Sequence, residues 1–217
     1  MTRMQGITRY FLLLVLALPF APISSAHAQQ SRFSDNDASR IATEVQKQLL
    51  KLPNYSVFDS LHFGLRGGVV TLGGYASRPT LKSDAERVVK KIEGVTEVDN
   101  QIEVLPNSPN DDRIRMAVYT RVYGQAQLRK YTSNFPNAAI TPSIARSAGG
   151  ITWDPPIGYH AIHIIVKNGN VILTGVVNNE SDSIIAQMQA NGTPGVFGVS
   201  NELYVVNQSG SKKELKK

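Results

Sequence analysis

The chain has 217 residues, no cysteine and a formal net charge of +6. The lack of cysteine excludes a disulfide framework and the thiol on which a bacterial lipoprotein is acylated. Two arginines lie before residue 10 and segment 211–217 carries +3, so residues 29–210 hold a net charge of only +1. Such a balanced charge disfavours a protein built mainly to bind nucleic acid, because those proteins present a broad basic face.

The N-terminal segment predicts a cleavable secretory signal. Arg3 and Arg9 precede the apolar run 11–18, and an Ala-His-Ala motif ends at Ala28, after which we expect cleavage. A membrane anchor is the alternative, but it needs roughly 20 apolar residues. Pro19 ends this run after eight residues. We therefore expect a mature protein that is periplasmic or secreted and has no transmembrane segment.

The rest of the chain contains an internal repeat at a constant offset of 101 residues. Four residues of a strand-turn-strand pattern recur at this offset: Gly68, Val70, Leu72 and Gly74 recur as Gly169, Val171, Leu173 and Gly175. A second group also recurs: Gly94, Val95, Val98, Asn100 and Val104 recur as Gly195, Val196, Val199, Asn201 and Val205. Identities at turn and buried-strand positions, all at one ungapped offset, indicate a duplicated unit.

In the first copy, alternating apolar residues predict strands at 61–65 and 70–74, joined by a turn at 66–68. A helix is predicted over 81–92, because apolar residues recur there at helical spacing between a proline and a glycine. A strand at 98–105 completes the copy.

The second copy repeats this order, with strands predicted at 162–166, 171–175 and 199–205. Its second helix is shorter. The apolar residues of that helix do not match the helical phase of the first copy: Ile184, Ile185 and Met188. We interpret the mismatch as a shift of one residue in the alignment.

Each copy also opens with a helix whose apolar residues lie four apart, namely Ile41, Val45 and Leu49 in the first copy and Ile114, Val118 and Val122 in the second. The order helix, strand, strand, helix, strand predicts an α+β fold. We expect two tandem αββαβ modules, each a three-stranded mixed sheet packed against two helices.

The expected organisation is a signal peptide at 1–28, a first module at 29–105, a linker at 106–111, a second module at 112–207 and a basic tail at 208–217. The second module carries a long insertion at about 129–158, which is rich in proline and has no clear periodicity. This composition predicts a long loop and leaves open whether the loop is functional or disordered.

Two motifs occur in both halves of the chain. The motif G-x-V-x-L-x-G occupies 68–74 and 169–175, and the motif G-V-x-x-V-x-N-x-I/L-x-V occupies 94–104 and 195–205. With this pair of motifs the chain resembles the BON family, named for bacterial OsmY and nodulation proteins. The resemblance implies a non-catalytic periplasmic or outer-membrane-associated protein. It further implies phospholipid binding, or support of envelope integrity under osmotic stress.

The inventory of residues suited to catalysis or metal binding is small. After residue 28 the histidines are His62, His160 and His163. Residues three apart on a strand point to opposite faces, so His160 and His163 are poorly placed to share a metal ion. The sequence has no P-loop, no dinucleotide-binding glycine motif and no G-x-S-x-G elbow. We predict neither an enzyme nor a bound cofactor or metal.

Two binding functions remain. The first is an envelope protein that binds anionic phospholipid or outer-membrane proteins and supports the envelope under stress. The alternative is a periplasmic chaperone-like protein that engages unfolded clients through exposed sheet edges.

The opening helix of the second module, residues 112–123, is the candidate contact surface. If its three apolar residues face the core, a rotation of about 100° per residue places two tyrosines and a methionine on or near the opposite side. Aromatic and cationic side chains together suit a membrane interface. The predicted lipid- or partner-binding residues are Arg113, Met116, Tyr119, Arg121, Tyr123, Arg129 and Lys130. The competing interpretation is that the insertion or the first module covers this face, because a helix that is apolar all round is usually buried.

Overall fold

The structure is a computed structural model of the whole chain, and it describes residues 34–133, 135 and 150–206. Residues 33–217 form one compact unit. The expected signal peptide, its cleavage site and the basic tail at 208–217 lie outside the described residues. None of the helices within the described ranges combines the length and the apolar character needed to cross a bilayer.

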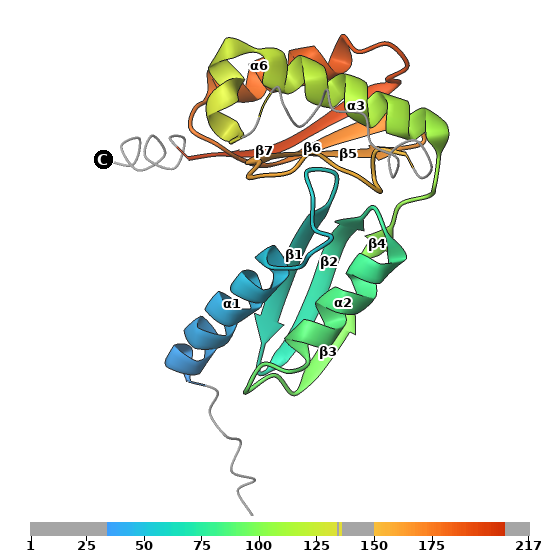
Figure 1. Cartoon of the computed structure of the whole chain (residues 1–217). Helices are drawn as coiled ribbons and strands as arrows, with labels where there is room; N and C mark the ends of the chain where they lie inside the picture. Colours follow the sequence, from blue (N-terminus) through green and yellow to red (C-terminus); the bar gives the residue numbers. More distant parts are fainter. Residues whose placement is uncertain (1–33, 134, 136–149, 207–217) are drawn as a thin grey trace, which may run out of the picture. The chain divides into compact units, whose positions relative to one another are not determined.

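The first module has the expected αββαβ order, with the last strand divided into two short strands. Its elements are α1 (Asp35–Leu50), β1 (Ser60–Arg66), β2 (Val69–Ala76), α2 (Pro79–Val89), β3 (Glu97–Asn100) and β4 (Glu103–Val104). β1 pairs antiparallel with β2, whereas β3 and β4 pair parallel with β2. A parallel pair needs a crossover connection, and α2 provides it between β2 and β3. Both helices, α1 and α2, lie on the same face of the sheet (Figure 1). The mixed sheet that the sequence predicts is confirmed.

The second module has the same arrangement with one addition. Its elements are α3 (Pro109–Gly124), the 3-10 helix η1 (Ala126–Tyr131), β5 (Ile162–Lys167), β6 (Asn170–Val177), α6 (Glu180–Asn191) and β7 (Gly198–Val205). β6 pairs antiparallel with β5 and parallel with β7. α3 begins inside the expected linker 106–111, because the Ser108 side chain accepts a hydrogen bond from Asp111 N and Pro109 fits the first helical turn.

The turn of the first hairpin requires glycine. Gly67 and Gly68 have φ angles of +56° and +89°, the left-handed pair that a tight hairpin needs. A Cβ on Gly68 would lie 3.1 Å from both the Gly94 carbonyl oxygen and Thr96 Oγ1. Both the positive φ angle and the close packing therefore disfavour any side chain at Gly68.

The repeat offset of 101 residues continues through α6 without a shift. The buried residues of α2 are Leu81, Ala85 and Val89, and their counterparts in α6 are Asp182, Ala186 and Ala190, which are also buried. The expected one-residue shift is therefore wrong. The two alanines of α6 face the core that α3 fills with large side chains, whereas Ile184 and Met188 turn outward.

Each module has its own core, but the loop after α1 belongs to the second one. Val57 and Phe58 are buried among residues of α3 and β5. Ile164 N in β5 donates a 2.8 Å hydrogen bond to the Val57 carbonyl oxygen. The chain between α1 and β1 thus covers part of the edge of β5.

Candidate functional site

The two tyrosines of α3 are buried. Ile114, Val118 and Val122 face the core as expected, but Tyr119 and Tyr123 are also fully inaccessible. The expectation that these tyrosines lie on an exposed outer face is therefore wrong. The competing interpretation holds for Tyr119, whose ring packs against Phe135 of the insertion and Phe58 of the first module. The Tyr123 ring packs against Tyr119 and against His160, which follows the insertion.

The tyrosines form hydrogen bonds with the segment that follows the insertion. Tyr123 Oη donates a 2.6 Å bond to the Ile162 carbonyl oxygen, and Tyr119 Oη lies 3.1 Å from His160 Nε2. His160 Nδ1 lies 2.9 Å from the Gly158 carbonyl oxygen, which can only accept, so the ring proton sits on Nδ1 and Nε2 accepts from Tyr119. Burial lowers the pKa of His160 to about 4, which keeps the ring neutral. These contacts are structural and leave no aromatic face for a ligand.

The remaining predicted residues of α3 are accessible to different degrees. Arg113 and Arg121 are exposed, whereas Met116 is partly buried and packs against the core. Arg121 reaches the C-terminal end of α6, where a Cβ on Gly192 would lie 3.1 Å from Arg121 Nη2. Cations are favoured at such a helix end.

The two cations of η1 are exposed but differ in their partners. Arg129 donates from Nη2 to the Gly124 carbonyl oxygen at 3.3 Å, and its guanidinium lies 5.9 Å from the centre of the Phe135 ring. Lys130 Nζ forms a 2.7 Å ion pair with Asp182, which raises the pKa of the lysine. The positive charge of Lys130 is thus largely compensated within the protein.

Two of the apolar residues in the second helix of this module are exposed. Ile184 and Met188 lie one turn apart on α6 and are 47% and 64% accessible. The repeat offset itself carried the signal, since it aligns the buried face of α2 with Asp182, Ala186 and Ala190. We define the helical surface by five exposed side chains, three arginines of α3 and η1 and two apolar residues of α6: Arg113, Arg121, Arg129, Ile184 and Met188.

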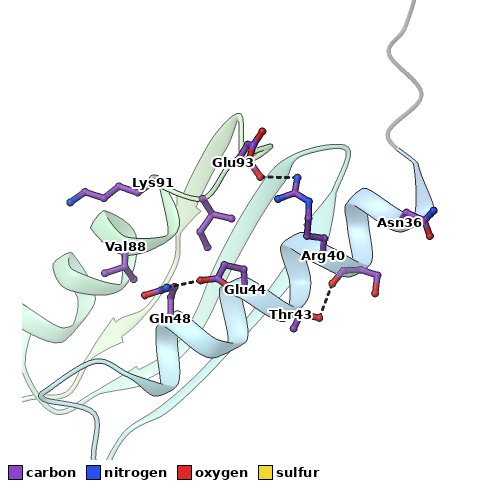
Figure 2. Close-up of a pocket in the computed structure, with 10 residues that line it drawn as sticks. Asn36, Arg40, Thr43, Glu44, Gln48, Val88, Lys91 and Glu93 are labelled. Carbon is purple, nitrogen blue, oxygen red and sulfur yellow. Dashed lines mark hydrogen bonds between the residues drawn. The ribbon is translucent and has the colours of Figure 1, made fainter.

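A groove of 950 Å³ lies between α1 and the C-terminal end of α2, and several of the side chains that line it bind within the protein (Figure 2). Arg40 Nη2 donates to the Glu93 carbonyl oxygen at 3.2 Å, and Gln48 Nε2 donates to Glu44 Oε1 at 2.6 Å. Figure 2 shows Lys91 directed away from this network. The guanidinium of Arg40 and the carboxylate of Glu44 are therefore engaged within the protein.

The histidines form no metal centre in the part of the chain that the structure describes, where no three His, Cys, Asp or Glu side chains are grouped to hold an ion. His163 packs against Tyr55 with ring centres 5.4 Å apart, and its Nδ1 lies 3.2 Å from the Ser56 carbonyl oxygen. Burial lowers the pKa of His163. Its role is to join the loop after α1 to β5.

Two αββαβ modules with matching strand registers and hairpin glycines define a tandem-repeat α+β protein. The chain belongs to the BON family, since the family model for the BON domain matches residues 36–106 and 145–207. The family suggests an envelope-related role involving phospholipid. No curated protein matches the sequence.

Solved structures give weak alignments. CdsD, a structural protein of the type III secretion system of Chlamydia trachomatis, aligns at 14% identity and a TM-score of 0.25, over 82% of this chain and 99% of that chain. A structure of the C-terminal domain of CdsD aligns at 14% identity and a TM-score of 0.23, over 76% and 96%. Scores this low carry no argument about fold or function.

Proposed function

We propose that this BON-family protein is a non-catalytic envelope protein that binds anionic phospholipid surfaces through the helical surface of its second module. In this role it supports envelope integrity under stress. The proposal includes a periplasmic or secreted location and signal cleavage after Ala28. Intact-mass measurement of the exported protein tests the cleavage site directly.

The observation that carries the proposal is that the last turn of α6 carries an exposed apolar side chain and has a cation at its end. Met188 is 64% accessible on this turn, and a Cβ on Gly192, the residue that ends the helix, would lie 3.1 Å from Arg121 Nη2. Burying a methionine side chain contributes about 1.5–3 kcal/mol. A cation near an anionic leaflet contributes about 1 kcal/mol. A few such contacts predict weak, salt-sensitive binding.

The helical surface replaces the contact set inferred from the sequence. Tyr119 and Tyr123 are buried, and Lys130 is paired with Asp182. The other three cations of the original set are exposed, namely Arg113, Arg121 and Arg129. Ile184 and Met188 supply the apolar component that the tyrosines were expected to provide.

Vesicle sedimentation of residues 29–217 tests the proposal. Met188→Glu should lower binding to phosphatidylglycerol vesicles several-fold, because it places a carboxylate at the anionic surface. Leu50→Glu is the matched control, since Leu50 is an exposed apolar residue of α1 with 62% accessibility. Both variants should bind phosphatidylcholine vesicles equally weakly.

A second comparison separates the helical surface from the lysine-rich tail. Arg113→Gln combined with Arg121→Gln should lower binding, whereas Arg66→Gln combined with Arg87→Gln removes the same charge from the first module and should not. If only a truncation after Gly210 lowers binding, the tail and not the helical surface is the contact. Suppression of client aggregation without any lipid binding would instead favour the chaperone-like alternative.

A further inference from the structure

A cavity of 540 Å³ lies at the N-terminus of α2, within the compact unit formed by residues 33–217. Ligand pockets for small organic molecules have volumes of about 300–1,000 Å³. Arg78 and Thr80 line it from the start of α2, and Arg115 lines it from α3. Leu105, Pro106 and Trp153 supply apolar wall. Its lining contains two arginines and neither aspartate nor glutamate, so the cavity suits an anion.

The N-terminus of α2 has no side-chain cap. Its N-cap residue is Arg78, Pro79 occupies the first helical position, and the first turn carries no acidic residue. The other α-helices within the described ranges are capped by the side chains of Ser34, Ser108 and Asn179. Uncapped N–H groups at a helix start favour an anionic acceptor.

A buried arginine supplies an independent observation. Arg115 is only 2% accessible; its Nη1 donates to Asp112 Oδ1 at 2.5 Å and its Nη2 donates to the Val166 carbonyl oxygen at 2.8 Å. Its Nε is buried and has no hydrogen-bond partner among the described residues. Buried donors are rarely left unpaired in native proteins, so an acceptor from outside the chain is expected here.

Arg78 brings positive charge that no acid in the cavity lining offsets. Its Nε donates to the Thr152 carbonyl oxygen at 2.7 Å, its Nη2 donates to the same oxygen, and its Nη1 donates to Asn54 Oδ1 at 3.3 Å. A guanidinium has five N–H groups, so two remain for a ligand. The guanidinium lies 5.8 Å from the centre of the Trp153 ring, which holds it at the cavity.

We propose that this cavity binds the phosphate group of a small organic phosphate, such as a glycerophosphate unit. The tetrahedral oxygens accept from Arg78, from the start of α2 and from Arg115 Nε, and the organic part packs on Trp153 and Pro106. The same glycerophosphate chemistry occurs in soluble metabolites and in phospholipid headgroups. The site uses none of the residues of the helical surface, so each proposal can fail without the other.

Trp153 gives a direct readout, because it is the only tryptophan of the chain. Its fluorescence is followed while residues 29–217 are titrated with inorganic phosphate, with glycerol 3-phosphate, and with phosphatidylglycerol or phosphatidylcholine vesicles. A saturable response to glycerol 3-phosphate identifies a soluble ligand. A response to phosphatidylglycerol vesicles alone identifies a lipid headgroup.

Two variants test the assignment, each with a matched control. Arg78→Gln should weaken the saturable response about tenfold, as expected for loss of a charge-assisted hydrogen bond, whereas Arg87→Gln on the same helix should leave it unchanged. Asn107→Asp places a carboxylate in the lining at an exposed position where folding is preserved, and it should weaken the response as well. Asn36→Asp on α1 is its control. The proposal is overturned if no phosphate compound changes Trp153 emission, or if Arg78→Gln and Asn107→Asp respond like the parent protein.

Discussion

Tyr131 Oη donates a 2.6 Å hydrogen bond to Asp182 Oδ2 and thereby ties η1 to the first turn of α6. The same carboxylate oxygen receives Lys130 Nζ at 2.7 Å and Asn179 Nδ2 at 3.0 Å. Burial alone would raise the pKa of Asp182, but the bonds from Lys130 and Tyr131 hold it below its ordinary value. A carboxylate can therefore occupy the position that Leu81 holds in the first module.

Tyr131→Phe should destabilise the protein by about 1–3 kcal/mol. The change removes the donor to Asp182, and it also removes the acceptor for Asn178 N, which donates to Tyr131 Oη at 2.7 Å. Urea unfolding at neutral pH measures the effect. Tyr159→Phe is the control, because Tyr159 is exposed and its loss should change the free energy of unfolding little. Equal stability of the two variants would contradict a supporting role for the Tyr131 hydroxyl.

Gly68→Val should destabilise the first hairpin by about 1–3 kcal/mol. The turn would hold valine at a left-handed backbone angle that its side chain disfavours, and the new side chain would press on Gly94 and Thr96. Gly64→Val is the matched control on β1, since a Cβ on Gly64 meets no atom within 4 Å and its φ is ordinary. Thermal melts of the two variants should separate clearly; a Gly68→Val melt that coincides with the parent's would reject the turn assignment.

Tyr119→Ser combined with Tyr123→Ser should unfold or strongly destabilise the second module, by more than about 3 kcal/mol, because each change empties a large buried volume. Loss of vesicle binding by this double variant would therefore report unfolding and not a lost contact. Near-ultraviolet circular dichroism distinguishes the two. A double variant that keeps its tertiary spectrum and its thermal midpoint would contradict the burial of these rings.

The repeat, the hairpins and the strand order could be predicted from the sequence because their signals are local. A turn glycine or an alternating apolar pattern determines the structure of only a few neighbouring residues, and both features recur in the second copy at the offset of 101. The exposure of Met188 could not be read from helical periodicity, since the buried face of α6 includes a carboxylate, Asp182. That carboxylate is stabilised by Tyr131 and Lys130, which lie about fifty residues away.

Burial of the α3 tyrosines was equally non-local. Tyr119 and Tyr123 are covered by His160 and Ile162, some forty residues downstream, across an insertion without periodicity. The cavity at α2 is assembled from segments near residues 54, 78, 106, 115 and 153. No sequence motif marks a site whose lining comes from five separate stretches of chain.

The stability of the protein should fall as the pH drops from 7 to 5, and His160 should account for part of the loss. Burial lowers the pKa of His160 to about 4, whereas the ordinary value is 6.5. At pH values between about 4 and 6.5 His160 is protonated in the unfolded chain but neutral in the native protein, so the free energy of unfolding decreases as the pH falls. For each such histidine the free energy of unfolding changes by at most about 1.4 kcal/mol per pH unit. Protonation of Nε2 would also remove the acceptor for Tyr119 Oη.

His160→Gln should flatten this dependence, leaving a smaller slope from His163, whose pKa burial also lowers. The variant loses stability at pH 7 as well, so the readout is the slope between pH 7 and pH 5 in urea unfolding and not the stability at one pH. His62→Gln is the matched histidine variant at an exposed position on β1. Restricting the range to pH 5 and above keeps the ordinary carboxylates ionised throughout. If the slope of His160→Gln equals that of the parent, His160 is not the buried neutral histidine that its contacts with Tyr119 and Gly158 indicate.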